Sequence, residues 1–327
     1  MFNPTFDQSI KNNVMKELTN TILMIRPVSF RMNEETAVNN YYQQNPEHLS
    51  AQTIQNKALK EFDDFVLKLR EHGVNVIVVE DRLETNTPDS IFPNNWISFH
   101  HNGKVGVYPM FAENRRLERR EDILDMLEEK GFIIEQIIDY SSAEEEGIFL
   151  EATGSIVLDR ENRIAYCALS ARADEDLFIE FCEDFEYTPV IFHAYQTVNG
   201  KRKLIYHTNV MMAITQKNVI VCLDCIDDKK EKKNFIDHVI NSGKQILEIT
   251  EEQVAHFAGN MLQVLDGNNK PLTVMSQAAF DSLNPDQLRI LESEATLLAS
   301  DLSTIETCGG GSARCMMAEV FLEVENE

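Results

Sequence analysis

Residues 150–169 read LEATGSIVLDRENRIAYCAL, an acidic residue followed by two apolar runs that flank a polar turn. The two runs, Ser155–Leu158 and Ile164–Leu169, have the pattern of a β-hairpin. A helix at about Asp174–Phe185 and an apolar strand at Pro189–Tyr195 are expected to follow. The stretch therefore predicts a unit made of a hairpin, a helix and a further strand.

This unit recurs along the chain. Further elements are expected as hairpins at 96–108, 210–223 and 261–275, helices at about 50–71, 114–130 and 227–241, and strands at 74–79, 132–138 and 245–249. A polar residue stands at the entrance to each repeated strand, at intervals of 53 to 56 residues: Asn95, Glu151, His207, Asn260 and Cys315. Regular spacing of this kind indicates an internal structural repeat.

The two ends of the chain are expected to complete the repeat. Thr21–Ile25 is an apolar, β-branched strand, whereas the last unit, Met316–Val324, has no strand after it to pair with. The N-terminal strand could fill that place and close the ring, which would remove exposed sheet edges. The sequence thus predicts a single domain over residues 1–327, a five-bladed α/β propeller in which the strands near 21–26 and 315–324 meet.

Closure of the ring would bring the strand entrances together around one axis. Glu151, His207 and Cys315 would then form an acidic group, a base and a nucleophile in a common site. Cys315 follows the three glycines within Glu306–Met317, where the backbone can approach a ligand closely. Taken singly, each residue is more simply interpreted as a packed thiol, a structural histidine or a surface carboxylate. Their shared register favours catalysis, and it favours Cys315 over Cys308 as the nucleophile.

Composition limits the classes of partner. A net charge of −24 disfavours nucleic acid and anionic membrane surfaces. Met1–Leu18 lacks the apolar core of a secretion signal, and no apolar run is long enough to span a membrane, so a reducing cytoplasm with free thiols is expected. Cys222 and Cys225 lie in an apolar run and are expected to pack in the core rather than bind zinc. Neither a metal nor another cofactor is expected, and the oligomeric state is left open.

The strand entrances resemble those of the amidinotransferase and guanidino-group hydrolase superfamily, the penteins, over almost the whole chain. The glycine loop with Cys315 is similar to the nucleophile motif of that superfamily, and Tyr206–Asn209 is similar to its histidine segment. Phe-Leu-Glu ending at Glu151 resembles its acidic motif, although Ala152-Thr153 replaces the usual Gly-Gly. The resemblance implies a five-bladed α/β propeller and catalysis by Cys315, His207 and Glu151 without a metal.

Further segments resemble the dimethylarginine hydrolases within this superfamily. Pro88–Phe92 is similar to their Pro-Asp-x-Val-Phe, which implies that Asp89 contacts the α-amino group of the substrate. Arg115 in Asn-Arg-Arg and Arg172 in Leu-Ser-Ala-Arg resemble arginines that bind the substrate carboxylate, where bidentate pairing is favourable. The expected set of substrate-binding residues is completed by three amides: Asn95, Asn209 and Asn260.

Two of these amides differ from the residues that relatives have at the matching positions, and the difference bears on the choice of substrate. Relatives that process a guanidinium commonly have Asp where Asn95 stands, and arginine deiminases have another where Asn209 stands. An amide can donate to a urea oxygen, whereas a buried carboxylate beside a neutral ligand costs free energy. The substitutions favour a ureido group. Four segments together resemble the citrulline utilization hydrolases: Arg26-Pro27, Asn39-Asn40-Tyr41, Phe92–Trp96 and Tyr206–Asn209.

The sequence therefore predicts a cysteine hydrolase that acts on the C–N bond of a ureido or guanidino amino acid. The favoured reaction converts citrulline to ornithine, carbon dioxide and ammonia. An arginine deiminase, a dimethylarginine dimethylaminohydrolase or an amidinotransferase would use the same catalytic set. The non-enzymatic alternative is an amino-acid-binding pentein that does not turn over its ligand.

Overall fold

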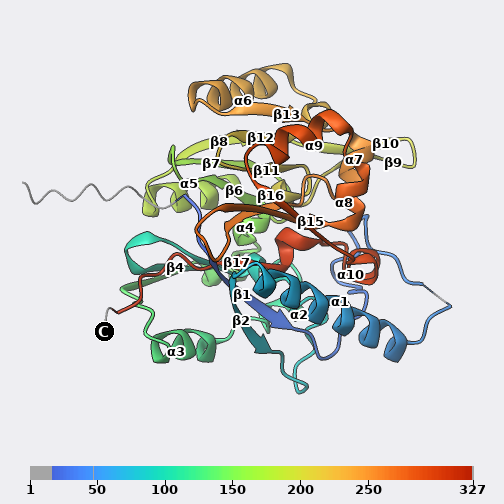
Figure 1. Cartoon of the computed structure of the whole chain (residues 1–327), viewed down its shortest axis with the longest axis vertical. Coiled ribbons are helices and arrows are strands. Elements are labelled where there is room, and N and C mark those ends of the chain that lie inside the picture. The colour runs from blue at the N-terminus through green and yellow to red at the C-terminus, as the bar shows by residue number, and fades with distance from the viewer. Residues whose placement is uncertain (1–16, 47, 326–327) are drawn as a thin grey trace, which may run out of the picture.

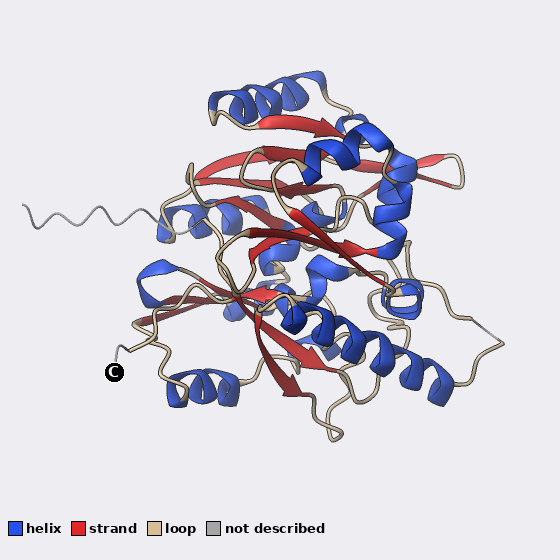
Figure 2. Ribbon diagram, viewed as in Figure 1, coloured by secondary structure: helices blue, strands red, loops and turns tan. Residues whose placement is uncertain are grey.

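Five three-stranded sheets form the framework of the computed structural model, which describes residues 17–46 and 48–325 (Figures 1 and 2). Each sheet has one antiparallel and one parallel strand pair around its central strand. The sheets, in strand order, are β17 (Ala318–Glu319), β1 (Thr21–Arg26) and β2 (Asn75–Glu80); β3 (Ile97–Phe99), β4 (Lys104–Val107) and β5 (Gln136–Asp139); β6 (Ile156–Asp159), β7 (Ile164–Ala168) and β8 (Thr188–Phe192); β11 (Met212–Ile214), β12 (Asn218–Val221) and β13 (Gln245–Glu248); and β14 (Leu262–Leu265), β15 (Pro271–Ser276) and β16 (Thr296–Ser300).

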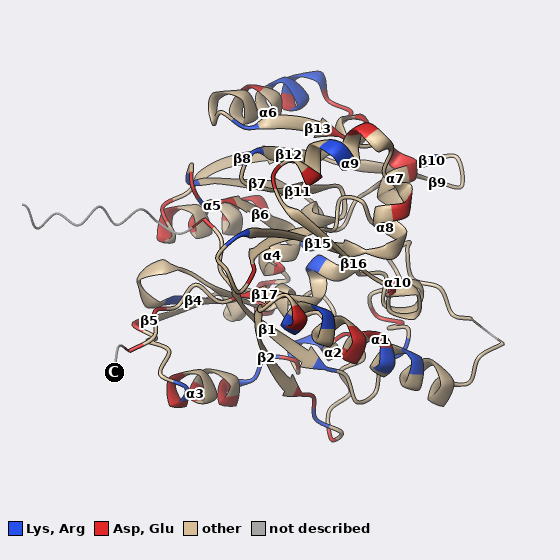
Figure 3. Cartoon of the chain, viewed as in Figure 1, with Lys and Arg blue, Asp and Glu red and all other residues tan. Residues whose placement is uncertain are grey.

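The helices that accompany these strands are α1 (Ala51–Glu71), α2 (Glu113–Arg116), α3 (Glu121–Glu129), α4 (Ala152–Ser155), α5 (Glu175–Asp184), α6 (Lys229–Asn241), α7 (Glu251–Ala255), α8 (Gln277–Ser282), α9 (Pro285–Glu292) and α10 (Ser303–Gly309). Helices α1, α2, α3, α5, α6, α8 and α9 connect the second and third strands of the units, whereas α4, α7 and α10 precede the first strand of a unit. Figure 3 shows acidic and basic residues along α1 and α6 and acidic residues along α3, and these helices lie at the periphery. The charged face of each is solvated while its apolar face packs inward.

The two ends of the chain meet in one sheet. β1 pairs with β17 through Ile22 opposite Glu319 and Leu23 opposite Ala318, in antiparallel register. The C-terminal strand is much shorter than the predicted 316–324, because residues after β17 leave β1 for another neighbour. Glu323 accepts a hydrogen bond from the Ile133 amide, and residue 324 forms a bridge with residue 132.

The predicted helix over 114–130 is wrong as a single element. It is divided into α2 and α3, and Arg120 between them has an extended backbone with φ −132°. The interruption lets two different sets of side chains face inward. Arg115 of α2 is buried in a polar cluster, whereas Ile123 and Leu127 of α3 join an apolar cluster under the β3–β5 sheet.

Several elements were not foreseen in the sequence. An exposed hairpin, β9 (Tyr195–Val198) with β10 (Lys201–Leu204), extends beyond β8. Its turn contains Asn199-Gly200, a pair typical of tight hairpins. The stretch from α8 to α10 was also unassigned, although Asn284 before Pro285 caps α9 with a recognisable capping box. β16 in this stretch completes the sheet that it forms with β14 and β15.

The core consists of apolar clusters between the sheets and the helices that cover them. Phe62, Phe65 and Leu69 place one face of α1 against the β1–β2 sheet, as the spacing predicted. Cys222 and Cys225 are fully buried in the largest cluster, in agreement with core packing.

Within residues 17–46 and 48–325, no helix is long and apolar enough to cross a membrane.

Candidate active site

The five residues predicted at the strand entrances are all buried. Asn95 ends a 3₁₀ turn (Pro93–Asn95), Glu151 precedes α4, His207 precedes a 3₁₀ turn (Thr208–Val210) and Cys315 lies within another (Ala313–Met316). Their relative exposures, with that of Asn260, are between 0% and 5%. The three tight turns lie directly before β3, β11 and β17, so they place these side chains at the start of each strand.

A small cavity of about 20 Å³ joins residues from distant parts of the chain. It is lined by the nucleophile candidate Cys315 together with His207 and Asn95. The other lining residues are Asn40, Asp89, Phe92, Arg115, Arg172, Tyr206, Gly309, Gly310 and Gly311. The structure thus brings together the thiol, the histidine and most of the predicted substrate-binding side chains. Glu151 does not line the cavity but is hydrogen-bonded to His207, which does.

Glu151 and His207 form a buried hydrogen-bonded pair. Nε2 of His207 is 2.6 Å from Oε2 of Glu151. Burial opposes ionisation of this carboxyl, but the charge of Arg172 and the hydrogen bond with His207 hold the pKa of Glu151 well below its usual value. Burial lowers the pKa of His207 to about 4, although Glu151 opposes that shift. At neutral pH the carboxylate is therefore ionised and the imidazole is neutral, with its proton on Nε2 and a free lone pair on Nδ1.

The sulfur of Cys315 faces two side-chain amides. Nδ2 of Asn260 is 3.2 Å and Nδ2 of Asn209 is 3.5 Å from Sγ. Asn260 also accepts from the backbone amide of Cys315, at 3.4 Å. Hydrogen-bond donors stabilise a thiolate relative to a thiol. Asn260, which the sequence placed at the entrance of a repeated strand, is in direct contact with the sulfur.

The glycine loop before Cys315 permits close packing. Gly310 has φ +63°, and a Cβ there would lie 2.6 Å from the side chain of Asn40. A Cβ on Gly309 or Gly311 would lie 2.8–2.9 Å from the ring of Phe92. The loop therefore needs glycine so that the backbone can adopt a left-handed conformation and pass close to these neighbours.

Asp89 has one oxygen bound and one without a partner. Asn33 and Thr36 donate to its Oδ2, at 2.8 and 3.0 Å, whereas the buried Oδ1 has no hydrogen-bond partner. Burial raises the pKa of Asp89, against the opposing charge of Arg115. A cationic group beside Oδ1 would favour the ionised carboxylate and would satisfy the acceptor that has no partner.

Arg172 is held between Glu151 and the segment that connects β1 to α1. Its Nη2 donates to the backbone oxygen of Thr36 at 3.0 Å, and it also donates to the side chain of Asn39. Its Nη1 is 3.5 Å from Oε2 of Glu151, and its guanidinium lies over the ring of Tyr206 at 4.7 Å. Arg172 thus lies at the cavity with its orientation determined by packing.

Arg115 is bound more tightly than the sequence suggested. Nε and Nη2 of Arg115 each lie 2.9 Å from an oxygen of Glu118, and Nη1 donates to Oδ1 of Asn95 at 2.8 Å. Burial raises the pKa of Glu118, and the charge and hydrogen bonds of Arg115 oppose that shift by favouring the ionised carboxylate. Glu118 was missed in the sequence, where its only signal was its position three residues after Arg115.

The segment between β1 and α1 was also missed as part of the site. Asn33, Thr36, Asn39 and Asn40 contact Asp89, Arg172 or the glycine loop. Clustered Asn and Thr residues in a segment without regular structure were the available signal. This segment covers the cavity and holds its charged groups in place.

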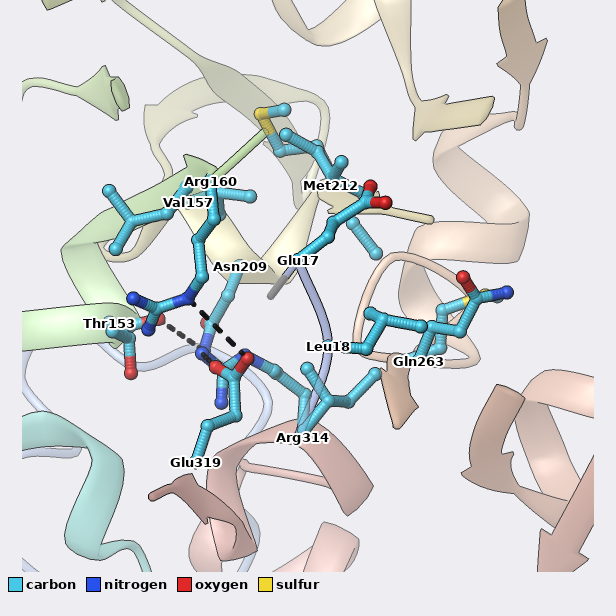
Figure 4. Close-up of a pocket in the computed structure, with 15 residues that line it drawn as sticks. Glu17, Leu18, Thr153, Val157, Arg160, Asn209, Met212, Gln263, Arg314 and Glu319 are labelled. Carbon is cyan, nitrogen blue, oxygen red and sulfur yellow. Dashed lines mark hydrogen bonds and ion pairs between the residues drawn. The ribbon is translucent and has the colours of Figure 1, made fainter. Parts of the chain in front are cut away.

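A second cavity, of about 40 Å³, lies on the other side of Asn209 (Figure 4). Arg160 and Arg314 both approach Glu319 there, at 3.8 and 3.0 Å. Asn209 and Thr153 line it, but Cys315, His207 and Glu151 do not. It is therefore distinct from the cavity that contains the thiol.

Across residues 17–46 and 48–325, no group of three or more His, Cys, Asp or Glu side chains is arranged to hold a metal ion.

Gly154 lies against two side chains of the cavity wall, Asn95 and His207. A Cβ at this position would lie 2.3 Å from Nδ2 of Asn95 and 2.9 Å from the His207 ring. Gly154→Ala is expected to displace both groups and to lower kcat/KM by at least about tenfold, because overpacking shifts side chains from their positions. Steady-state kinetics and thermal unfolding would measure the two effects.

Gly243→Ala is the matched control for this substitution. Gly243 has φ +83°, so an alanine there strains the backbone, but its Cβ would have no neighbour within 4 Å. This variant should unfold at a lower temperature with unchanged kcat/KM. Wild-type kinetics in Gly154→Ala would show that the close approach at the cavity wall does not affect turnover.

Five three-stranded sheets with a cysteine, a histidine and a glutamate at their strand entrances define the class of this protein as a pentein-type α/β protein. The family model described as "N,N dimethylarginine dimethylhydrolase, eukaryotic" matches residues 26–322. The chain therefore belongs to this family of hydrolases. No curated protein sequence matches significantly.

Solved structures of the superfamily share the fold at low sequence identity. The cyanobacterial arginine dihydrolase ArgZ superposes with a TM-score of 0.70 at 16% identity; the match covers 93% of this chain but only 41% of that longer one. The N-terminal domain of ArgZ bound to substrate gives 0.67 at 18% identity and is covered to 97%, against 92% of this chain. A Pseudomonas aeruginosa DDAH variant complexed with citrulline gives 0.62 at 15% identity, covering 93% of this chain and all 100% of that one.

Proposed function

We propose that this protein is a cysteine-dependent hydrolase that converts citrulline to ornithine, carbon dioxide and ammonia. The observation that carries the proposal is the set of neutral amides around the thiol: Asn209 and Asn260 donate toward Sγ of Cys315, and Asn95 lines the same cavity. Amide donors match the oxygen of a ureido group, and they leave no unpaired carboxylate beside a neutral ligand.

The amino-acid end of the substrate would be held by charged groups at the cavity. The orphaned Oδ1 of Asp89 suits the α-ammonium group. Arg172 supplies positive charge for the carboxylate, and Arg115 contributes through its remaining donor and its charge. This assignment orients the ureido carbon toward Cys315 and His207.

Catalysis would begin with transfer of the thiol proton from Cys315 to Nδ1 of the neutral His207. The thiolate attacks the ureido carbon, and the imidazolium returns the proton to the leaving amine, which gives an S-carbamoyl enzyme. His207 then takes a proton from water, whose oxygen attacks the carbamoyl carbon, and the proton passes to the leaving thiolate, which restores the thiol and releases carbamic acid. Carbamic acid breaks down to carbon dioxide and ammonia. Glu151 stabilises the transient positive charge on His207, from which it is 2.6 Å away. Ornithine, carbon dioxide and ammonia account for all atoms of citrulline and one water.

The architecture behind this site is proposed to be a closed five-bladed α/β propeller that forms one domain over the chain. Support comes from the equal topology of the five sheets and from the pairing of β1 with β17. Convergence of five strand entrances at buried positions is what such closure would produce. The protein would act on a small molecule without a cofactor.

Arginine is the second candidate substrate. The arginine dihydrolase ArgZ has the same fold, and the Glu151 carboxylate lies beside the cavity, where it could pair with a guanidinium. Product analysis with citrulline, arginine, methylated arginines and agmatine, assayed side by side, would decide between the candidates. Ornithine from citrulline supports the proposal. Citrulline accumulating from arginine, or binding without turnover, would reject it.

Charge selection gives a second test of the substrate. Asn95→Asp combined with Asn209→Asp should lower the ratio of kcat/KM for citrulline over arginine by about tenfold or more, because added carboxylates attract a guanidinium. At position 209 a carboxylate would also lie close to the sulfur, since Nδ2 is now 3.5 Å from Sγ of Cys315. Like charge there would disfavour the thiolate.

Binding measurements on a Cys315→Ser background separate affinity from chemistry in this experiment. The two single variants should differ in their affinity for arginine. An Asp at position 95 would pair with Arg115, whose Nη1 is 2.8 Å from Oδ1 of Asn95, and its charge would be partly neutralised. Asn209→Asp is therefore expected to gain more affinity for arginine than Asn95→Asp. An unchanged ratio in the double variant would contradict selection by neutral amides.

A further inference from the structure

A buried chain of polar contacts runs from Glu118 through Arg115 to Asn95. Both oxygens of Glu118 are bound by Arg115, at 2.9 Å each, and Nη1 of Arg115 donates to Oδ1 of Asn95 at 2.8 Å. The exposures of Glu118, Arg115 and Asn95 are 3%, 2% and 2%. Water therefore does not compete for these contacts, and each group constrains the next.

This chain determines which end of the Asn95 amide faces the cavity. Because Arg115 donates to the oxygen, that oxygen is occupied and the amide cannot turn without placing two donors against each other. One N–H of Nδ2 donates to Oδ1 of Asn94 at 3.1 Å. Nδ2 of Asn95 also lies against Gly154, and the ring of His207 lies against the same glycine. The remaining N–H is thus available beside the catalytic histidine.

We propose that Glu118 is a positioning residue that determines substrate preference: through Arg115 it holds Asn95 as a hydrogen-bond donor, which favours a ureido oxygen over a guanidinium. A guanidinium carries only N–H donors and offers no acceptor to Asn95, whereas a urea oxygen does. The inference rests on the proposed function, which it extends to a residue outside the cavity wall.

The position of Arg115 depends on Glu118 because two other carboxylates compete for it. Oδ2 of Asp89 is 4.0 Å and Oε2 of Glu151 is 3.9 Å from the Arg115 guanidinium. Neither is in hydrogen-bond contact, whereas Glu118 binds in a bidentate arrangement. Removing the charge of Glu118 would let Arg115 move toward these carboxylates and release the oxygen of Asn95.

The test is Glu118→Gln, which keeps the size of the side chain and removes its charge. The ratio of kcat/KM for citrulline over arginine should fall by about tenfold, because a released amide can present its oxygen to a guanidinium. Glu144→Gln is the matched control, since Glu144 binds Arg119 and Arg116 in the same region without contact with Asn95. Its ratio should equal that of the wild type.

An equal loss of both activities in Glu118→Gln would show a merely structural role and overturn the proposal, as would an unchanged ratio. If Glu118→Gln does not fold, Glu118→Asp retains the charge and withdraws it by one methylene group. That variant should lower the ratio in the same direction but by less. A ratio equal to that of the wild type would then count against the proposal.

A readout without substrate separates this inference from the proposed function. In the free protein, the side-chain ¹⁵N–H signals of Asn95 should shift in Glu118→Gln and stay unchanged in Glu144→Gln. Unshifted signals in Glu118→Gln would overturn the positioning role even if citrulline is the substrate. Shifted signals in a protein that turns over neither citrulline nor arginine would instead reject the proposed function and retain the role of Glu118 in orienting Asn95.

Discussion

Cys315→Ser is expected to lower kcat by more than about a hundredfold while the protein remains folded. A serine hydroxyl is far less acidic than a thiol, so the nucleophile would no longer be available near neutral pH. The amides of Asn209 and Asn260, at 3.5 and 3.2 Å from Sγ, would still bind the hydroxyl and preserve the local packing. Initial rates and thermal unfolding of the purified variant would measure activity and stability separately.

Cys308→Ser provides the matched control for the thiol. Cys308 directly precedes the same glycine loop but does not line the cavity, and burial raises its pKa. A raised pKa makes this thiol a poor nucleophile. The control should keep wild-type kcat and lose some stability. Loss of activity in Cys308→Ser with full activity in Cys315→Ser would reverse the assignment.

His207→Gln is expected to lower kcat by about 10²–10⁴, the range typical of removing a general acid–base group. His207 is the neutral imidazole beside the ionised Glu151, so its replacement removes the group that accepts the thiol proton. Gln keeps a hydrogen-bond donor for Glu151, which limits structural damage. The measurement is kcat over a range of pH, together with thermal unfolding.

His100→Gln controls for the loss of a buried histidine. His100 is 4% exposed, compared with 2% for His207, and burial also lowers its pKa. It binds Ser98 at 2.7 Å and does not line the cavity. This variant should lose stability and keep its kcat. If both variants lose activity in proportion to their stability, the catalytic role of His207 is wrong.

The amino-acid sequence by itself determined the repeat and the candidates at its strand entrances. Apolar runs with period 2, closed by polar turns, are local signals, so hairpins such as 155–169 were readable without tertiary structure. The regular interval then placed Asn95, Glu151, His207 and Cys315 in equivalent positions. Equivalence in a repeat is enough to infer proximity without knowing any side-chain direction.

Only the tertiary structure decided which groups bind those residues. Glu118, which holds Arg115, had no local signal beyond its position three residues later, because its role depends on burial at the centre of the protein. The division of the helix at Arg120 and the short β17 were likewise decided by packing, since buried polar groups and a competing strand partner outweigh local propensity. Sequence periodicity reports which face is apolar, whereas hydrogen bonds between segments far apart depend on how the sheets come together.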